Sequence, residues 1–576
     1  MKNVKNLFGM AVMATALVGC SSNDNLNPNP NDNAGKAGTA YASFKINLPT
    51  TSGTRAADDG KPTFAEGTAD EYEVKNGTIL IFDTDGKFVE SAELGTMNPW
   101  TKDTDPNGVT TAAAATVQLH HVKVGTSYKA LVLLNNNVDA TTKKVTLPSV
   151  GDSYYTWSAT VGNANASKYE STADGIFMAN APKYKSDTEN PTTLVDFNSV
   201  YASREQAQAN PATVVYVERG LAKVTMADFA PNYPIAAGTY KGDNVKIVNW
   251  QLDVTNKSTF PIHQADLKSE WSAVWSEPRF YDTKESSAFK RVYWGTDPNY
   301  DGTDNLTLIN CQAAFKMIGN GDVKGLAGIA NPQYCLENTF DLDNMMQGQT
   351  TRVVFKAVYT PKSLVGESVK TFYKVANNTA VWKGADLEQQ IKTLALQAMK
   401  ITDPTEQKKY GVDLSKGSNI SGVAGQHLIQ EANITYSGTP AASKVTLAIV
   451  NTVNEKLGLK VEGGKITTGI STYLNGEAYY IARIKHFNTL TPWEAGQPTY
   501  KDVPHITLEE SNKKYLGRYG VLRNNWYALS VTKISNLGYP EVPEVKPNIP
   551  DDENDQYINV EVKILDWAKR TQEIEL

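Results

Sequence analysis

The thiol of Cys20 is the side chain whose chemistry the sequence defines best. Two lysines precede an apolar run from Leu7 to Val18, which is shorter than the roughly 20 residues that a helix needs to span a bilayer. The run ends in Leu17-Val18-Gly19-Cys20, the pattern of a lipobox, in which the cysteine sulfur forms a thioether with diacylglycerol. We therefore predict a lipoprotein signal peptide over residues 1–19 and a membrane anchor of acyl chains such as palmitate on Cys20. An ordinary cleaved signal peptide with a chance cysteine is the alternative.

Two further cysteines, Cys311 and Cys335, could react with each other. In an exported chain such a pair can form a disulfide, which would stabilise the fold by about 3 kcal/mol in the chain-entropy model. The alternative is two separate buried thiols that pack as small hydrophobic side chains. The sequence leaves both interpretations open. It places no histidine near either cysteine, which argues against a zinc site.

Catalytic motifs are missing from the sequence. The nucleophile elbow G-x-S-x-G, the zinc-protease pattern H-E-x-x-H, the pair C-x-x-C and the Walker phosphate loop do not occur. The histidines are scattered, and the one adjacent pair would point to opposite faces of a strand; they are His120, His121, His263, His427, His486 and His505. Paired aspartates such as Asp301 and Asp304 lie in turn-like segments, where aspartate commonly serves the turn. We therefore predict no enzyme activity, no metal site and no cofactor.

One aromatic cluster could bind a ligand, because aromatic rings stack on sugars. Its members fall within a short stretch of the chain: Trp271, Trp275, Phe280, Tyr281, Tyr293 and Trp294. In a β-rich domain such side chains more commonly fill the core or pack across a hairpin. The sequence favours the packing interpretation.

The composition describes a β-rich globular protein. The 576 residues are enough for two large domains, and 28 Tyr, 16 Phe and frequent Val and Thr favour strands. The 56 Lys and Arg against 62 Asp and Glu leave a net charge of −6. This balance predicts no general attraction to nucleic acid or to anionic lipid.

The first structural element expected after the anchor is a strand. Residues 21–40 are rich in Asn and poor in apolar side chains, so they fit a tether between lipid and fold. In the segment 42–48, Phe44, Ile46 and Leu48 alternate with polar residues, which predicts a strand with one buried face. A polar run of small residues follows and carries a single arginine, Arg55. Such a run is accessible to proteases.

The remaining chain shows further strand patterns, one helix pattern and one break. The strands are expected at 79–82 and 88–89, joined by a turn at 83–86, and at 117–119, 128–134, 214–217, 222–226 and 245–252. Apolar residues at helical spacing after Gly384 predict a helix over 385–400. The Pro-containing segment 230–234 suggests a domain boundary.

The C-terminal end combines a proline-rich spacer with a strongly alternating strand. Prolines at 540, 543, 547 and 550 predict a stiff, extended spacer that ends in an acidic run. Within residues 557–576 the apolar side chains of Ile558, Val560, Val562 and Ile564 share one face. Such a strand has two alternatives: it folds back on its own domain, or it pairs with a sheet edge of another molecule.

Together, several of these segments resemble the fimbrillins, the pilins of the type V pili of Bacteroidia, and most closely the major subunit of the short, or minor, fimbriae. The lipobox and the first strand with Arg55 behind it carry the resemblance at one end. It continues in YVERGLAKV at 216–224 and VLRNNWYALSV at 521–531, and it ends with the strand region 562–576. The order of these segments carries the resemblance more than any single one of them.

The resemblance implies a fold and a route of assembly. The expected fold is mainly β, with two transthyretin-like β-sandwich domains, a few short helices and an extended C-terminal strand. The protein would be exported as a lipoprotein to the cell outer membrane, and an arginine-specific protease would then cut between Arg55 and Ala56. The implied partners are other copies of the chain in a head-to-tail polymer, anchor and tip pilins, that protease and, before maturation, the outer membrane.

The resemblance and the residue patterns together divide the chain into five parts. They are a signal peptide (1–19), a lipidated propeptide with the first strand (20–55), an N-terminal β-sandwich (56–232), a C-terminal β-sandwich (233–539) and a spacer with the donor strand (540–576).

Physical reasoning leads to the same mechanism. Loss of the first strand would expose unpaired backbone and an apolar groove, which a strand from another copy could fill. The apolar donor residues Ile558, Val560, Val562 and Ile564 would each contribute about 1.5–3 kcal/mol, and a contact of this head-to-tail type builds an open filament. We therefore favour a structural pilin in surface fimbriae that serve adhesion. The alternatives are a glycan-binding outer-surface lipoprotein and an unrecognised hydrolase.

Overall fold

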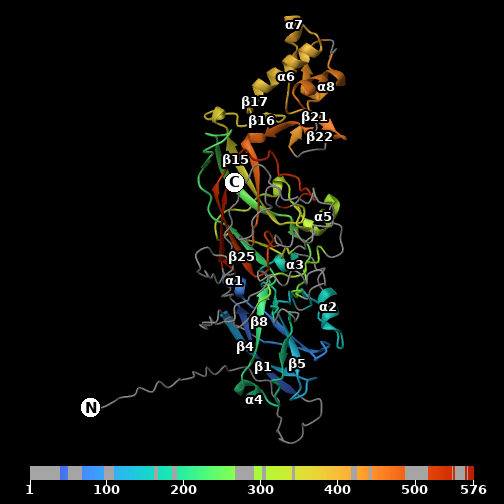
Figure 1. The fold of residues 1–576 in the computed structure, drawn as a ribbon, viewed down its shortest axis with the longest axis vertical. Coiled ribbons are helices and arrows are strands. Elements are labelled where there is room, and N and C mark those ends of the chain that lie inside the picture. The colour runs from blue at the N-terminus through green and yellow to red at the C-terminus, as the bar shows by residue number, and fades with distance from the viewer. Residues whose placement is uncertain are drawn as a thin grey trace, which may run out of the picture.

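The computed structural model describes most of the folded chain. The described residues are 39–49, 68–95, 109–139, 141–160, 167–184, 191–265, 291–300, 307–339, 344–416, 425–439, 444–486, 517–547, 549, 551, 565–566 and 569–575. The fold is mainly β with several sheets and few short helices, as predicted. Figure 1 shows an elongated molecule, in which β1, β4 and β5 lie near one end and the helices α6, α7 and α8 lie at the other.

The N-terminal part forms one eight-stranded sheet. Its strand order is β3-β2-β5-β6-β8-β1-β4, and β7 pairs with β5. The bounds are β1 Ala40–Pro49, β2 Gly77–Phe82, β3 Phe88–Glu93, β4 Val109–Leu119, β5 Tyr128–Leu134, β6 Met178–Asn180, β7 Val195–Phe197 and β8 Thr213–Arg219. Short helices flank the sheet: α1 Ala69–Tyr72, α2 Tyr154–Thr160, α3 Ser167–Glu170 and α4 Arg204–Ala209.

At its strand β2, both faces of this sheet are buried. In β2, Ile79 and Ile81 pack into one core, whereas the alternate residues Leu80 and Phe82 pack into another. The second core also contains Trp526 from the C-terminal part of the chain. The two parts are therefore in direct contact through side chains.

The β2–β3 hairpin forms where the sequence predicts it. Its turn is held by the carboxylate of Asp83, which accepts hydrogen bonds from the backbone N–H groups of Asp85 and Lys87 at 3.0 and 2.8 Å. Gly86 has a φ of 78°, a conformation that glycine adopts without steric cost.

The C-terminal part is a sandwich of two sheets around one core. One sheet has the order β10-β11-β15-β24 and the other the order β14-β9-β25-β26-β27. Residues of both sheets, such as Trp250, Phe355 and Tyr527, share the core between them. The bounds are β9 Ala222–Met226, β10 Tyr233–Pro234, β11 Asn244–Asp253, β14 Gln333–Cys335, β15 Arg352–Thr360, β24 Glu477–Arg483, β25 Asn525–Lys533, β26 Leu565–Asp566 and β27 Lys569–Glu575. Beside the sandwich lie α5 (Leu308–Ala314), β12 (Thr255–Asn256) and β13 (Phe315–Lys316), and the last two pair with each other.

The chain changes sheet earlier than the Pro-containing segment 230–234 suggested. β8 ends at Arg219 in the first sheet, and β9 begins at Ala222 in the second. The segment 230–234 contains the end of the loop after β9 and the short strand β10, which pairs with β11, so it lies inside the C-terminal part. The pattern of turn residues cannot distinguish such a loop from a connection between sheets.

An insert separates β15 from β24, although these strands are antiparallel neighbours. It has its own hydrophobic core, in which α6 packs on α8. The helix α6 spans Gly384–Ala398, buries Leu387 and Ile391, and confirms the helix predicted over 385–400. The other elements are β16 Phe372–Val375, β17 Trp382–Lys383, α7 Pro404–Gln407, β18 Tyr410–Val412, β19 Gln426–His427, β20 Ile434–Tyr436, α8 Leu447–Lys456, β21 Lys460–Glu462, β22 Lys465–Thr468 and β23 Ile470–Tyr473.

Candidate functional site

The strand β1 lies inside the first sheet, between β4 and β8. It pairs antiparallel with β4 from Ala40↔Leu119 to Pro49↔Val109, and parallel with β8 from Phe44↔Thr213 to Asn47↔Tyr216. Within the described part of the chain, β4 pairs with no strand other than β1. Removal of β1 would therefore leave unpaired backbone on both sides of the gap.

One face of β1 belongs to the hydrophobic core. Ala42, Phe44 and Ile46 are fully buried, and the ring of Phe44 meets the ring of Phe197 edge-to-face at 5.1 Å between centroids. Burial of a side chain such as Phe44 or Ile46 contributes about 1.5–3 kcal/mol. This confirms the strand and the inward face of Phe44 and Ile46 that the alternation predicted.

The other face of β1 is polar and partly covered. Ser43 and Thr116 share a hydrogen bond of 2.8 Å between their hydroxyl oxygens. The helix α4 packs over β1, where the guanidinium of Arg204 lies 5.7 Å from the ring centre of Tyr41. The gap left by β1 would thus have one apolar wall and one polar wall, which suits an alternating strand.

The residues proposed for lipidation and cleavage, Cys20, Arg55 and Ala56, lie outside the described residues. The described part of β1 ends at Pro49, six positions before Arg55 in the sequence. The structure therefore shows the strand that a cut at Arg55 would separate, but it gives no geometry for the cut itself.

The C-terminal strand lies on the sheet of its own chain. β27 pairs parallel with β25, from Trp526↔Lys569 to Lys533↔Glu575, and β26 pairs antiparallel with both of them. This arrangement corresponds to the fold-back alternative for the end of the chain. The donor residues Ile558, Val560, Val562 and Ile564 lie outside the described residues.

The described residues of the proline-rich spacer are packed on the C-terminal sandwich. Backbone hydrogen bonds of 2.8 Å join Tyr539 to Tyr479 on β24, and the carbonyl of Pro543 accepts a 2.7 Å hydrogen bond from Arg352 Nη2. A Cβ atom on Gly348 would lie 2.7 Å from the Cα of Pro547, so the spacer approaches this glycine closely. The spacer therefore acts as a docked strap as far as Asp551.

Asp551 fixes the end of this strap. Its backbone N–H donates to Met345 at 3.0 Å, and its carboxylate accepts a hydrogen bond from the Thr350 hydroxyl at 3.3 Å. Burial raises the pKa of Asp551 to about 7, against the opposing charges of Arg483 and Arg518. The chain is therefore held to the C-terminal part at Asp551.

A buried network of charges joins the two parts of the chain at β8. The Glu218 carboxylate accepts hydrogen bonds from Arg291 Nε at 2.9 Å and Nη2 at 2.7 Å, and it lies 2.6 Å from His263 Nδ1. Burial opposes ionisation of Glu218, but Arg291 and His263 outweigh it and lower its pKa to about 2. Since the folded pKa is below the ordinary 4.5, this stabilisation is present at neutral pH and is lost as the pH falls from about 4.5 to 2.

A second buried pair continues the network. Arg523 donates to both carboxylate oxygens of Glu337 and to the carbonyl oxygens of Phe260 and Pro261 at 2.7 and 3.0 Å. Next to it, Arg219 donates to the side-chain oxygen of Asn524 at 3.3 Å. Both arginines are almost fully buried.

A third pair lies beside them. Lys223 pairs with the carboxylate of Glu71, which also accepts a 2.7 Å hydrogen bond from the Tyr334 hydroxyl. The ammonium of Lys223 lies 3.9 Å from the ring centre of Trp526. The segments 216–224 and 521–531, which the sequence singled out, therefore meet in this junction. Sequence reasoning did not find the network, because a charged residue such as Glu218, on the face opposite Val215 and Val217, has the pattern of an exposed position.

Breaking the first of these pairs should destabilise the whole chain. The substitution Arg291→Met leaves the Glu218 carboxylate buried without its strongest partner, and we expect the free energy of unfolding to fall by about 3–5 kcal/mol. Denaturant unfolding followed by circular dichroism measures this. The control Lys383→Met removes an exposed partner of Glu367 and should leave the unfolding free energy unchanged. Equal effects of the two substitutions would contradict the proposed role of the junction.

Cys311 and Cys335 do not form a disulfide in the structure. Cys311 lies on α5 and Cys335 on β14, and they belong to different hydrophobic cores. Burial raises the pKa of the Cys311 thiol to about 11. The second alternative for the cysteines, separate buried thiols, therefore describes this structure.

The thiols can be checked by labelling. We expect the native chain lacking its signal peptide and Cys20 to react with no thiol reagent on the time scale of minutes, because burial disfavours the thiolate of Cys311 and of Cys335. The denatured, unreduced chain should show two reactive thiols. Labelling that needs prior reduction would instead indicate a disulfide.

The other sequence candidates for a binding site fall into the core or outside the described residues. Tyr293 and Trp294 are buried in a hydrophobic core, whereas Trp271, Trp275, Phe280 and Tyr281 are not described. Among the described residues, no three His, Cys, Asp or Glu side chains come together as a metal site would require. None of the described helices has the length and apolar character needed to cross a membrane.

Comparison with known proteins places the C-terminal region in a family. Residues 471–573 match the family model described as major fimbrial subunit protein type IV, Fimbrillin, C-terminal. The match includes β25 and the strap, and it confirms the resemblance to fimbrillins. No curated protein matches the sequence.

Among solved structures, a fimbrial assembly protein from Parabacteroides distasonis is similar to this chain. The sequences are 13% identical, and the similarity covers 55% of this chain and 80% of the other with a TM-score of 0.26. A similarity at this TM-score supports no conclusion about fold or function.

Proposed function

We propose that this chain, a fimbrillin by its C-terminal region, is a structural pilin subunit that polymerises into surface fimbriae and serves adhesion. One observation supports the mechanism above others: the internal strand β1 precedes the polar segment that carries Arg55. A single cut there would release β1 from its covalent link to the rest of its sheet. The gap between β4 and β8 would then accept a strand from another copy.

The C-terminal strand has the pattern that this gap requires. In β1, Ala42, Phe44, Ile46 and Leu48 alternate with polar residues, and the residues Ile558, Val560, Val562 and Ile564 have the same spacing. Because the side-chain period of a strand is two, either set can present its apolar residues to the same core. A donor strand from the next subunit can therefore restore both the backbone pairs and the apolar wall.

The strap supports a head-to-tail assembly. It holds the chain to the C-terminal sandwich as far as Asp551, while β1 lies in the N-terminal sheet (Figure 1). Donor and acceptor are thus on different surfaces, and repeated use of such a contact builds an open filament. The buried junction around Glu218 and Arg523 would carry load between the two surfaces.

The maturation steps belong to the same proposal. The precursor would be held in the cell outer membrane by acyl chains on Cys20 until an arginine-specific protease cuts between Arg55 and Ala56. Anchor and tip pilins would be the other partners of the filament.

Mass spectrometry of protein recovered from surface filaments tests this function directly. We expect an N-terminus at Ala56 and no lipid on the assembled subunit. Filament protein that begins at a lipidated Cys20 would contradict the proposed maturation.

A further inference from the structure

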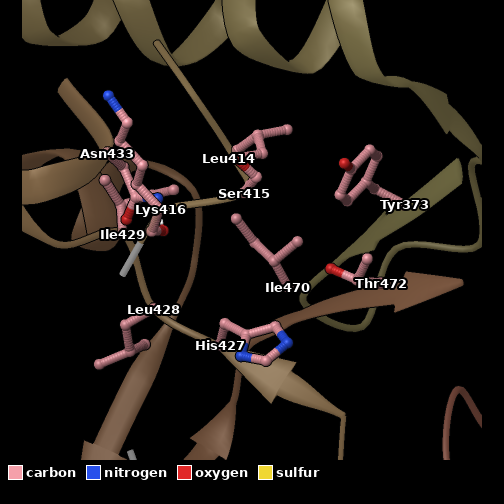
Figure 2. Close-up of a pocket in the computed structure, with 10 residues that line it drawn as sticks. All are labelled: Tyr373, Leu414, Ser415, Lys416, His427, Leu428, Ile429, Asn433, Ile470 and Thr472. Atoms are coloured by element: carbon pink, nitrogen blue, oxygen red, sulfur yellow. Dashed lines mark hydrogen bonds between the residues drawn. The ribbon is translucent and has the colours of Figure 1, made fainter. Parts of the chain in front are cut away.

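The insert between β15 and β24 contains a cavity of about 170 Å³ (Figure 2). Tyr373 of β16 and Ile470 and Thr472 of β23 form one side, and Leu414 forms part of the other. His427 of β19 lies at the base in the view of Figure 2. The cavity belongs to none of the features described above. β16, which carries Tyr373, contacts α6, and both elements lie at the opposite end of the molecule from β1 (Figure 1).

Several polar groups of the lining are available to a ligand. Within the described part of the chain, the hydroxyl groups of Tyr373 and Thr472 and the imidazole of His427 make no hydrogen bond to protein. Burial lowers the pKa of His427, so its ring is neutral at physiological pH and offers one donor and one acceptor. Half-buried hydroxyl and imidazole groups without partners gain from a ligand that hydrogen-bonds to them.

The charges around the lining disfavour an anionic ligand. Lys416 is the cation of the lining, and its ammonium is already 3.5 Å from the carboxylate of Asp413, with both side chains exposed. The carboxylates of Glu388 and Asp413 act on Tyr373, and that of Glu541 acts on His427. An anion in the cavity would meet these carboxylates, and the ammonium of Lys416 is already paired.

The size and the apolar walls restrict the ligand further. The volume is below the roughly 300–1,000 Å³ of sites for drug-sized ligands, so the cavity suits one small ring or the end of a longer chain. Leu414 and Ile470 offer aliphatic walls, and Tyr373 offers an aromatic ring beside its hydroxyl. A purely apolar ligand would leave Thr472 and His427 unpaired. A pyranose ring has an apolar C–H face and hydroxyl groups at its edge, and it meets both demands.

We propose that this cavity binds a single neutral sugar residue, such as the terminal residue of a glycan. The C–H face of the ring would pack on Tyr373 and Ile470, and its hydroxyl groups would bond to Thr472, His427 and the Tyr373 hydroxyl. The proposal goes beyond assembly, since all of these residues belong to the insert and none belongs to β1 or the strap.

Titration of the purified chain with single sugars tests the proposal. The probes are the methyl glycosides of glucose, galactose, mannose and N-acetylglucosamine, measured by saturation-transfer NMR and calorimetry. We expect at least one of them to bind, and we expect Tyr373→Phe and Thr472→Val each to raise its Kd about tenfold. These substitutions remove hydroxyl groups that bond to no described residue, so the fold should be kept. The matched control Tyr436→Phe removes a hydroxyl of the same insert that bonds to Glu406, outside the lining, and should leave the Kd unchanged.

Three results would overturn the proposal. They are the absence of binding by all four glycosides, unchanged binding in both cavity variants, and displacement of the sugar by equimolar acetate or cyclohexanol. The chain with Arg55→Ala, which should not assemble, should bind sugar as the wild type does. Failure of the sugar site and failure of the assembly mechanism are therefore separate results.

Discussion

Replacing Arg55 with alanine should abolish filament formation while the subunit stays folded. Without the cut, β1 remains covalently linked to its sheet and continues to fill the gap between β4 and β8. A donor strand would have to displace a tethered strand whose Phe44 and Ile46 are fully buried. Electron microscopy of the cell surface measures the filaments, and circular dichroism of the purified chain measures the fold.

Two further variants make this test specific. Lys61→Ala removes a charge a few residues downstream in the same segment and should leave assembly unchanged. A chain in which residues 51–56 are replaced by the site of a sequence-specific protease should form filaments only after that protease is added. Filaments of Arg55→Ala as abundant as those of the wild type would show that activation does not occur at this bond.

The pairing and burial of β1 also indicate how assembly proceeds after the cut. Its backbone pairs and its two large buried side chains remain in place when the peptide bond is broken, so β1 stays bound as a separate peptide. Assembly is then an exchange of one strand for another of the same alternation. The net gain in free energy is therefore smaller than the free energy gained by burying either strand in an empty gap.

Local patterns in the sequence were enough to find single elements. Alternation identified β1, a helical repeat identified α6, and the Asp-rich turn identified the β2–β3 hairpin. These signals arise from neighbours in the chain, which decide which side chains share a face. They carry no information about which strands pair when the strands are far apart.

The features that the sequence did not reveal all depend on such distant contacts. The insert could not be recognised, because β15 and β24 are neighbours across more than a hundred intervening residues. The same holds for the parallel pairing of β27 with β25. From the sequence, a charged residue such as Glu218 is expected on the exposed face of a strand, because its partners His263 and Arg291 lie in a different part of the chain.

Deleting residues 557–576 should leave a folded chain that no longer assembles. The hydrophobic cores of the described structure contain no residue beyond Val545, and the strap is held as far as Asp551 without the tail. The truncated chain loses β27, an edge strand, and thus the backbone pairs with β25. Its groove is intact after the cut at Arg55, so it can accept a wild-type strand but cannot donate one. Added to wild-type protein, it should cap filaments and shorten them.

A milder pair of variants tests whether assembly needs the apolar face of the donor strand or only the presence of the strand. Val560→Asp with Val562→Asp places two carboxylates on the face that would enter the apolar groove, at a cost of several kcal/mol each, and should stop assembly. The matched control, Asn559→Asp with Lys563→Asn, makes the same change in net charge on the opposite face of the strand and should assemble normally. Electron microscopy of the protease-treated variants, beside their circular dichroism, decides between the two alternatives for this strand.

Long filaments from a folded, truncated chain would exclude the donor role. Loss of folding on truncation would show that β27 is a permanent strand of its own sheet, because an exchangeable donor must be able to leave β25 without unfolding the subunit.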